Sequence, residues 1–165
     1  MHIRDEKHGD EAVIFDLTQA AFAPMPYSSG TEGPIINALR RDGDLTLSRV
    51  AIEGDEIIGH IAFSPVTIKR AKAPWFALGP VSVQPDKQGR GVGSALIHDG
   101  LEQLKSLSAN GCVLVGNPAY YGRFGFKNDG RISYGDVPSE FVQWLSFEGD
   151  MPSGEIRYSP AFEAE

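Results

Sequence analysis

The spacing of hydrophobic and polar positions predicts a chain that mixes helices and strands. After Asp10, apolar residues recur every three or four positions up to Pro24, which predicts a helix with Asp10 as its N-cap. A second apolar stripe predicts another helix that ends at Gly43. The Pro- and Gly-rich loop between these helices, residues 24–33, is of a kind that often carries substrate contacts.

Three strand patterns follow the second helix, at residues 45–52, 57–68 and 75–83. The polar turn at residues 53–56 predicts a hairpin, and the third strand is expected to continue an antiparallel meander. Pro80 lies inside this third strand and cannot donate to a hydrogen-bond ladder. We therefore expect a bulge or break there that leaves backbone free to bind something else.

A long helix with one apolar face is predicted over residues 91–109, closed by Asn110-Gly111 in the left-handed conformation. The buried strand expected at residues 112–115 completes a strand, helix and strand, which predicts a parallel crossover. A short helix is expected at residues 118–123. Weaker strand patterns lie at residues 126–134, 141–147 and 154–158.

Composition limits the possible functions. The chain has 165 residues, of which 41% are hydrophobic and 22% charged, as expected of one globular domain spanning residues 1–165. A net charge of -7 argues against nucleic acid or an anionic membrane as partner, because such binding needs a basic surface. No apolar run is long enough to cross a bilayer, and the first residues lack the apolar segment of a secretory signal. We therefore expect a cytoplasmic protein.

Cysteine and histidine give no sign of a metal or disulfide framework. Cys112, the single cysteine, lies in an apolar strand pattern and is expected to be buried. The four histidines show no ligand spacing, so no metal site is expected.

A glycine turn, Gln88-Gly89-Arg90-Gly91-Val92-Gly93, lies between the third strand and the long helix. A helix start offers unpaired amides and partial positive charge, glycines allow close approach, and the arginine can add a forked contact. The turn therefore predicts a phosphate or pyrophosphate site. A P-loop is excluded because Ser94 and Ala95 stand where Lys and Ser or Thr are required, and a dinucleotide fingerprint lacks its third glycine. A turn that only joins strand to helix is the alternative.

This turn resembles the Q/R-x-x-G-x-G/A signature of the GCN5-related N-acetyltransferases (GNAT). The segments LGPVSV at residues 78–83 and NPAYYGRFGF at residues 117–126 resemble the partner motifs, especially those of the YhbS-like branch of bacterial predicted acetyltransferases. The resemblance covers residues 3–126 in element order, and residues 154–162 are similar to the C-terminal end of that branch.

The resemblance implies an α/β (α+β) GNAT fold: a mixed, mostly antiparallel sheet of about seven strands and about four flanking helices, with a splayed parallel pair of strands. It also implies acetyl-CoA as cosubstrate and direct acetyl transfer to a primary amine of a small molecule or peptide, without a metal. A homodimer is compatible with the family. The implied cofactor-binding residues are Val81, Ser82, Val83, Gln88, Gly89, Arg90, Gly91, Val92, Gly93, Ser94, Asn117 and Tyr120.

Side-chain roles follow from the same resemblance. Tyr121 matches the tyrosine of Y-x-x-x-G-F and is the expected general acid, since a phenol of pKa about 10 can protonate a departing thiolate of pKa about 8.5. Its alternative is an aromatic side chain that only fills the core. Asn117 either orients the cofactor or caps a turn, and Glu32 either binds the cationic substrate or stabilises a helix N-terminus. No general base is identifiable.

Two other functions compete with the enzyme. One is a non-catalytic module of the same fold that senses acyl-CoA or an amine, in which replacing Tyr121 by Phe changes nothing measurable. The other is a nucleotide-binding regulatory domain, which ATP or NAD would stabilise and acetyl-CoA would not.

Overall fold

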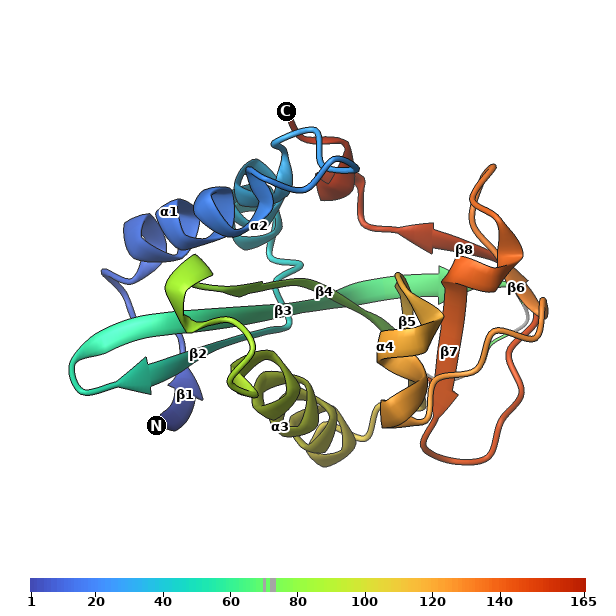
Figure 1. The fold of residues 1–165 in the computed structure, drawn as a ribbon. Helices are drawn as coiled ribbons and strands as arrows, with labels where there is room; N and C mark the ends of the chain where they lie inside the picture. Colours follow the sequence, from blue (N-terminus) through green and yellow to red (C-terminus); the bar gives the residue numbers. More distant parts are fainter. Residues whose placement is uncertain (70, 72–73) are drawn as a thin grey trace. The chain divides into compact units, whose positions relative to one another are not determined.

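The computed structural model describes residues 1–69, 71 and 74–165, which divide into two compact units. Unit 1 comprises residues 1–64, 79–100 and 159–165, and unit 2 comprises residues 65–78 and 101–158. Figure 1 shows the helices and strands of which the units consist. In chain order the described elements are β1 (His2–Asp5), α1 (Glu11–Phe22), α2 (Glu32–Asp42), β2 (Leu47–Glu53), β3 (Glu56–Ile68), β4 (Trp75–Val83), α3 (Val92–Ser106), β5 (Gly111–Val115), α4 (Pro118–Tyr121), β6 (Ile132–Ser133), β7 (Val142–Ser146) and β8 (Gly154–Tyr158).

The strands of unit 1 form an antiparallel arrangement in the order β1, β2, β3. The predicted hairpin is confirmed, with Gly54 at φ 62° in its turn. Helices α1 and α2 pack together, and their apolar residues share one buried cluster with the strands. This cluster comprises Ile14, Leu17, Ile36, Val50, Ile52, Ile57 and Ala62.

The other face of β3 packs against the first half of α3. A Cβ at Gly100 would lie 2.3 Å from the Phe63 ring, and one at Gly59 would lie 2.9 Å from Leu96. These glycines let helix and strand approach closely. From Gly59 to Phe63 the odd-numbered residues of β3 therefore face α3, while His60 and Ala62 face the cluster under α1 and α2. A register shift opposite Ala51 and Ile52 interrupts this alternation, so Ile57 also belongs to that cluster.

The N-cap prediction for α1 is half right. Asp10 occupies the N-cap position, but its side chain caps no helix amide and the residue has helical φ and ψ. Its carboxylate instead accepts hydrogen bonds from Arg4, at 2.8 Å, and from the Lys7 amide, also at 2.8 Å. A charge-assisted hydrogen bond to Arg4 is stronger than one to a helix amide, so the carboxylate binds Arg4.

In unit 2, β4 and β5 pair in parallel, which confirms the predicted crossover through α3. β5 pairs with β7 antiparallel, and β8 pairs with both β3 and β6. Together the described strands make a mixed sheet of eight, mostly antiparallel. Trp75 and Trp144 are buried in its apolar cluster, and Cys112 is buried as expected.

Two local predictions in this unit are wrong. The left-handed residue after α3 is Ser108, at φ 61°, while Gly111 begins β5, where a Cβ would lie 2.3 Å from the Trp75 ring. Gly111 is thus required by packing rather than by a helix cap. The strand expected over residues 126–134 is reduced to β6, because the hydrogen bonds of Lys127 go to Trp144 as an isolated bridge.

Candidate functional site

The pairing of β4 with β5 ends before Pro80, as the sequence predicts. The parallel ladder runs from Trp75 opposite Gly111 to Ala77 opposite Val113. Gly79 follows at φ 123°, and the Gly79-Pro80 peptide bond is cis. Residues 79–83, the last part of β4, belong to unit 1.

One edge of this last part of β4 faces β3. The Gln84 amide donates to the Ile58 carbonyl at 2.9 Å, and the Ser82 carbonyl lies 3.3 Å from a Cβ built at Gly59. Because backbone groups alternate between the two edges of a strand, the amide of Ser82 points to β3 while those of Val81 and Val83 point to the other edge. Two of the three predicted backbone contacts therefore face away from β3.

The glycine turn leads directly into α3. Gln88 ties the turn to β4 by donating from Nε2 to the Val83 carbonyl at 3.1 Å. Gly89 and Gly91 have φ of 77° and 84°, a region that side chains other than glycine rarely adopt. The Ala95 amide donates to the Gly91 carbonyl, so the amides of residues 92–94 precede the first helical hydrogen bond. The turn thus presents free helix amides behind two glycines, as an anion requires.

Arg90 of the turn and Lys87, just before the turn, both contact a carboxylate that no sequence motif indicated. Glu53, in the hairpin before β3, contacts Arg90 and Lys87 at 3.2 Å each. A hydrogen bond from Lys87 and the charge of Arg90 lower the pKa of Glu53. The predicted forked contact of Arg90 with an anion therefore competes with Glu53, which lies 37 positions away in sequence.

The downstream motif, in unit 2, contains a capped turn and an aromatic group. Asn117 Oδ1 accepts from the Ala119 amide at 2.9 Å, so this side chain caps α4, one of its two expected roles. The Arg123 guanidinium lies 4.7 Å from the centre of the Tyr120 ring, which meets Tyr121 edge-on at 4.9 Å.

The ring of Tyr121 lies over Gly116, a residue that the sequence analysis did not single out. A Cβ at Gly116 would lie 2.6 Å from the Tyr121 ring. Gln143 Nε2 donates to the Gly116 carbonyl at 2.9 Å, and the ring of Phe126 meets that of Tyr121 edge-on, with centroids 6.2 Å apart. Tyr121 is half-buried. The only sequence sign of this arrangement is a glycine directly after a buried strand and before Asn117.

Glu32 is the first residue of α2, where a carboxylate stabilises the helix start. Its Oε1 accepts from the Ser28 hydroxyl at 2.6 Å. Gln19 of α1 holds the same loop, accepting from the Gly33 amide at 2.9 Å and donating to the Gly30 carbonyl at 3.0 Å. The contacts of Glu32 thus match the second of its two expected roles.

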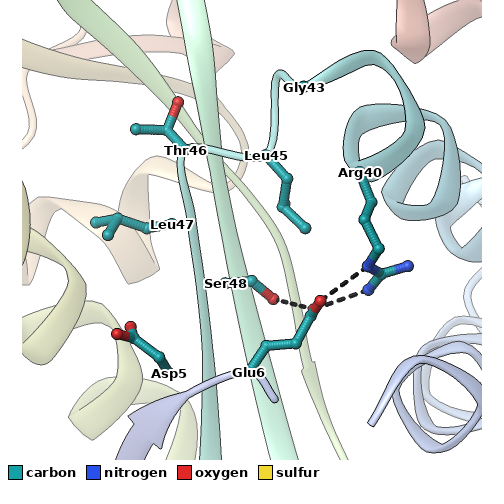
Figure 2. Close-up of a pocket in the computed structure, with 8 residues that line it drawn as sticks. All are labelled: Asp5, Glu6, Arg40, Gly43, Leu45, Thr46, Leu47 and Ser48. Atoms are coloured by element: carbon teal, nitrogen blue, oxygen red, sulfur yellow. Dashed lines mark hydrogen bonds and ion pairs between the residues drawn. The ribbon is translucent and has the colours of Figure 1, made fainter. Parts of the chain in front are cut away.

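A polar pocket of about 390 Å³ lies elsewhere in unit 1 (Figure 2). Its lining includes Glu6, which accepts two hydrogen bonds from Arg40, at 2.8 and 2.7 Å, and one from the Ser48 hydroxyl at 2.6 Å. Ser48 Oγ also lies 2.7 Å from Nε2 of His60. None of these side chains belongs to a motif that the sequence indicated.

Burial and charge set the ionisation of this network. Although burial raises the pKa of Glu6, hydrogen bonds from Arg40 and Ser48 outweigh it and lower that pKa below its usual value. Burial lowers the pKa of His60 to about 4. At neutral pH the network therefore contains an ionised carboxylate and a neutral imidazole.

Comparison with known proteins identifies the family. The model of the acetyltransferase (GNAT) domain matches residues 2–128. The chain belongs to the GNAT acetyltransferase family. It is 35% identical to the uncharacterized N-acetyltransferase YhbS of Escherichia coli over 102 residues, which are 61% of each chain. It is 36% identical to the uncharacterized N-acetyltransferase YjhQ of Escherichia coli over 130 residues, or 76% of this chain and 68% of YjhQ.

Solved structures show the same fold. A GNAT family acetyltransferase from Brucella melitensis, in complex with acetyl-CoA, has a TM-score of 0.87 and 48% identity over 98% of this chain and 97% of that one. YhbS from Escherichia coli, in complex with CoA, has a TM-score of 0.88 and 27% identity over 98% of this chain and 91% of that one. The predicted GNAT fold is therefore confirmed.

Two features are absent from the described part of the chain. Over residues 1–69, 71 and 74–165, no helix combines the length and apolar character that a membrane span needs. Within the same ranges, no three His, Cys, Asp or Glu side chains form a group that could hold a metal ion.

Proposed function

We propose that the protein is an acetyl-CoA-dependent N-acetyltransferase that moves the acetyl group directly to a primary amine of a small molecule or peptide. The observation that carries the proposal is the free amide cluster at the start of α3, behind two left-handed glycines and after an interrupted strand. Family membership supports it, as do the acetyl-CoA and CoA complexes of two structural relatives.

The cofactor would be held mainly by backbone. The amides of Val92, Gly93 and Ser94 would bind the pyrophosphate, with Gly89 and Gly91 keeping side chains away from it. Arg90 would add charge after leaving Glu53. The backbone of β4 at residues 81–83 would bind the pantetheine arm, and Gln88, Asn117 and Tyr120 would complete the site.

The chemistry needs three contributions from the chain. The amine nitrogen attacks the thioester carbonyl carbon, and the negative charge that develops on oxygen would be stabilised by outward amides of β4, those of Val81 and Val83. The carbon-sulfur bond then breaks, and the departing thiolate takes a proton from the phenol of Tyr121. The cationic amine, which Glu32 is proposed to hold, gives one proton to solvent before it attacks. The second proton that the nitrogen loses on forming the amide returns through solvent to the phenolate of Tyr121.

A thermal shift series tests the cofactor. At 100 times its dissociation constant a ligand adds about 2.7 kcal/mol, which for this size raises the melting temperature by roughly 5 to 10 °C. Acetyl-CoA and CoA should give this shift, whereas ATP and NAD should not. A shift with ATP or NAD alone would establish the regulatory domain instead.

Thiol release with a panel of primary amines tests the reaction. Tyr121→Phe should lower kcat by about 100-fold while the acetyl-CoA shift stays unchanged, because only the proton donor is lost. A protein that binds acetyl-CoA but releases no thiol with any amine, in either form, would be the sensing module.

The remaining parts of the proposal concern organisation. Both units would form a single N-acetyltransferase domain over residues 1–165, supported by the Brucella melitensis relative that matches 98% of the chain. A homodimer and a cytoplasmic location remain predictions, which size-exclusion chromatography with light scattering and cell fractionation would test.

A further inference from the structure

Gly116 follows the last paired residue of β5, and one of its two backbone hydrogen bonds is made by a side chain. The Gly116 amide donates to the Phe141 carbonyl at 3.0 Å. In a regular antiparallel pair the Phe141 amide would return a bond to the Gly116 carbonyl, but it donates to the Pro138 carbonyl at 3.0 Å instead. Gln143 Nε2 takes that place at 2.9 Å, and because a carbonyl can only accept, the amide nitrogen of the side chain must face it.

Gln143 is a buried amide in an otherwise apolar stretch of β7. Its exposed fraction is 1%, and its neighbours Val142 and Trp144 are buried in the apolar cluster of unit 2. Burying an amide costs free energy unless the amide is hydrogen-bonded, and a buried carbonyl without a donor costs free energy as well. The bond from Gln143 to Gly116 therefore satisfies two groups that the regular strand pairing leaves without partners.

Gln143 lies on the same side of the sheet as Tyr121. In the register of β5 and β7 it stands opposite Leu114, and side chains directly opposite one another share a side. A Cβ built at Gly116 would lie 2.6 Å from the Tyr121 ring and 3.4 Å from Leu114, so these two side chains are on one side of Gly116. Gln143 thus binds Gly116 on the side where the Tyr121 ring packs.

The peptide that Gln143 binds is the one from which α4 starts. Its amide half belongs to Asn117, the N-cap of α4, whose carbonyl accepts from the Tyr121 amide at 3.0 Å. Pro118 restricts Asn117 to an extended conformation, here with ψ 115°, whereas Gly116 has no side chain to restrict it. The orientation of the Gly116–Asn117 peptide therefore depends on the hydrogen bonds of Gly116, one of which comes from Gln143.

We propose that Gln143 positions the Tyr121 hydroxyl for proton transfer, by fixing the Gly116–Asn117 peptide from which α4 begins. This inference rests on the proposed function, in which the phenol of Tyr121 protonates the departing thiolate. A misplacement of about 1 Å can cost about 100-fold in rate, so a small rotation of this peptide is enough to matter. Because Gln143 is buried and acts through Gly116, it is a positioning residue and not a catalytic one.

Two replacements remove the bond in different ways. Gln143→Met keeps the length of the side chain without a donor, and Gln143→Asn keeps an amide that is one methylene too short to reach Gly116. Each should lower kcat about tenfold, while KM for acetyl-CoA stays within about threefold of the wild type. Thr18→Val is the matched control, because it also removes a buried donor to a backbone carbonyl, at 2.7 Å, and it should change kcat less than about twofold. Unchanged kcat in both Gln143 variants would overturn the proposal.

Combination with Tyr121→Phe separates positioning from a general loss of structure. Gln143→Met should lower kcat about tenfold in the wild type and less than about twofold in Tyr121→Phe, because the hydroxyl that Gln143 positions is then already gone. Similar losses in the two backgrounds would overturn the proposal. Failure of the proposed function would be seen separately, as a wild type that acetyl-CoA does not stabilise or that releases no thiol with any amine.

A second measurement needs no turnover. In ¹³C spectra of the tyrosine rings, Gln143→Met should move the signals of Tyr121, which Tyr121→Phe assigns. The signals of Tyr134, whose ring lies beside that of Tyr158 with centroids 4.7 Å apart, should stay in place. Unmoved Tyr121 signals, or equal shifts of Tyr121 and Tyr134, would overturn the positioning role.

Discussion

The glycine turn and the network around Glu6 are both polar sites of unit 1, but they are built differently. The turn consists of consecutive residues that would bind an anion through their backbone amides, so the local sequence is enough to identify it. The network joins side chains separated by 34, 42 and 12 positions in sequence, from Arg40 to Glu6, from Ser48 to Glu6 and from Ser48 to His60. A site made of backbone is visible in a motif, whereas a site made of side chains from separate elements exists only after folding.

The two sites also differ in their response to change. The turn faces solvent, and its requirement is that two positions lack side chains. The network is partly buried, with His60 fully so, and its requirement is that each donor meets an acceptor. We therefore expect single substitutions at the turn to affect ligand binding, and substitutions in the network to affect stability and pH dependence.

The largest expected effect is the acid sensitivity of the network. Because the folded pKa of His60 lies below the usual value of 6.5, the unfolded chain binds a proton more readily between pH 6.5 and pH 4, so stability falls as pH falls through this window. A shift of this size corresponds to a loss of about 3 kcal/mol. In urea titrations from pH 7 to pH 4, His60→Asn should lose this component, whereas His8→Asn, at an exposed site, should keep it. Equal slopes in the wild type and His60→Asn would contradict the buried neutral imidazole.

The next effect is confined to the turn. Gly91→Val should weaken acetyl-CoA at least 100-fold, or about 2.7 kcal/mol, because a branched side chain at φ 84° distorts the turn and covers the helix amides. Gly54→Val is a matched control, since Gly54 also has a positive φ and open space around it but lies in the hairpin turn. Isothermal titration with acetyl-CoA measures both. If the two variants lose affinity alike, general strain rather than the phosphate site would explain the loss.

A smaller effect is expected where a side chain packs directly against a glycine, as Tyr121 does against Gly116. Gly116→Ala would place a Cβ 2.6 Å from the Tyr121 ring and displace it, lowering kcat about tenfold with little change in acetyl-CoA affinity. Gly122→Ala, where a Cβ meets nothing within 4 Å, should leave kcat nearly unchanged. A reduced kcat in Gly122→Ala alone would show that the position of the Tyr121 ring is not decisive.

The smallest expected effect concerns a contact between the backbone turn and a side chain distant in sequence, the ion pair of Arg90 with Glu53. Glu53→Gln should release Arg90 and remove a negative charge near the turn, so acetyl-CoA should bind about two- to fivefold more tightly at low salt. The gain should vanish in about 1 M salt because exposed charges are then screened. Glu102→Gln, which removes the partner of Lys105 on α3, is the control. Weaker binding in Glu53→Gln would mean that Glu53 positions Arg90 for the phosphate.

Local pattern was sufficient for most of the fold. Apolar periodicity predicted α1, α2 and α3, and alternation predicted β2, β3 and β4, with β4 matching the predicted limits of residues 75 and 83. Local pattern failed to predict the role of a residue where contacts with other elements of the fold determine that role. The Asp10 carboxylate accepts from Arg4 of the preceding strand, six positions away, instead of capping α1. Gly111 is required by close packing against Trp75, which lies far from it in sequence.

The sequence by itself determined the family, the parallel crossover and the glycine turn, because each depends on residues within one short stretch or on a repeating spacing. Tertiary structure alone decided the ion pair of Glu53 with Arg90, the packing of Tyr121 on Gly116 and the hydrogen-bonded chain from Glu6 to His60. The physical reason is that a hydrogen-bond direction or a close contact is a property of atoms in space. Charged and buried groups take the partner that folding places beside them, whatever their separation along the chain.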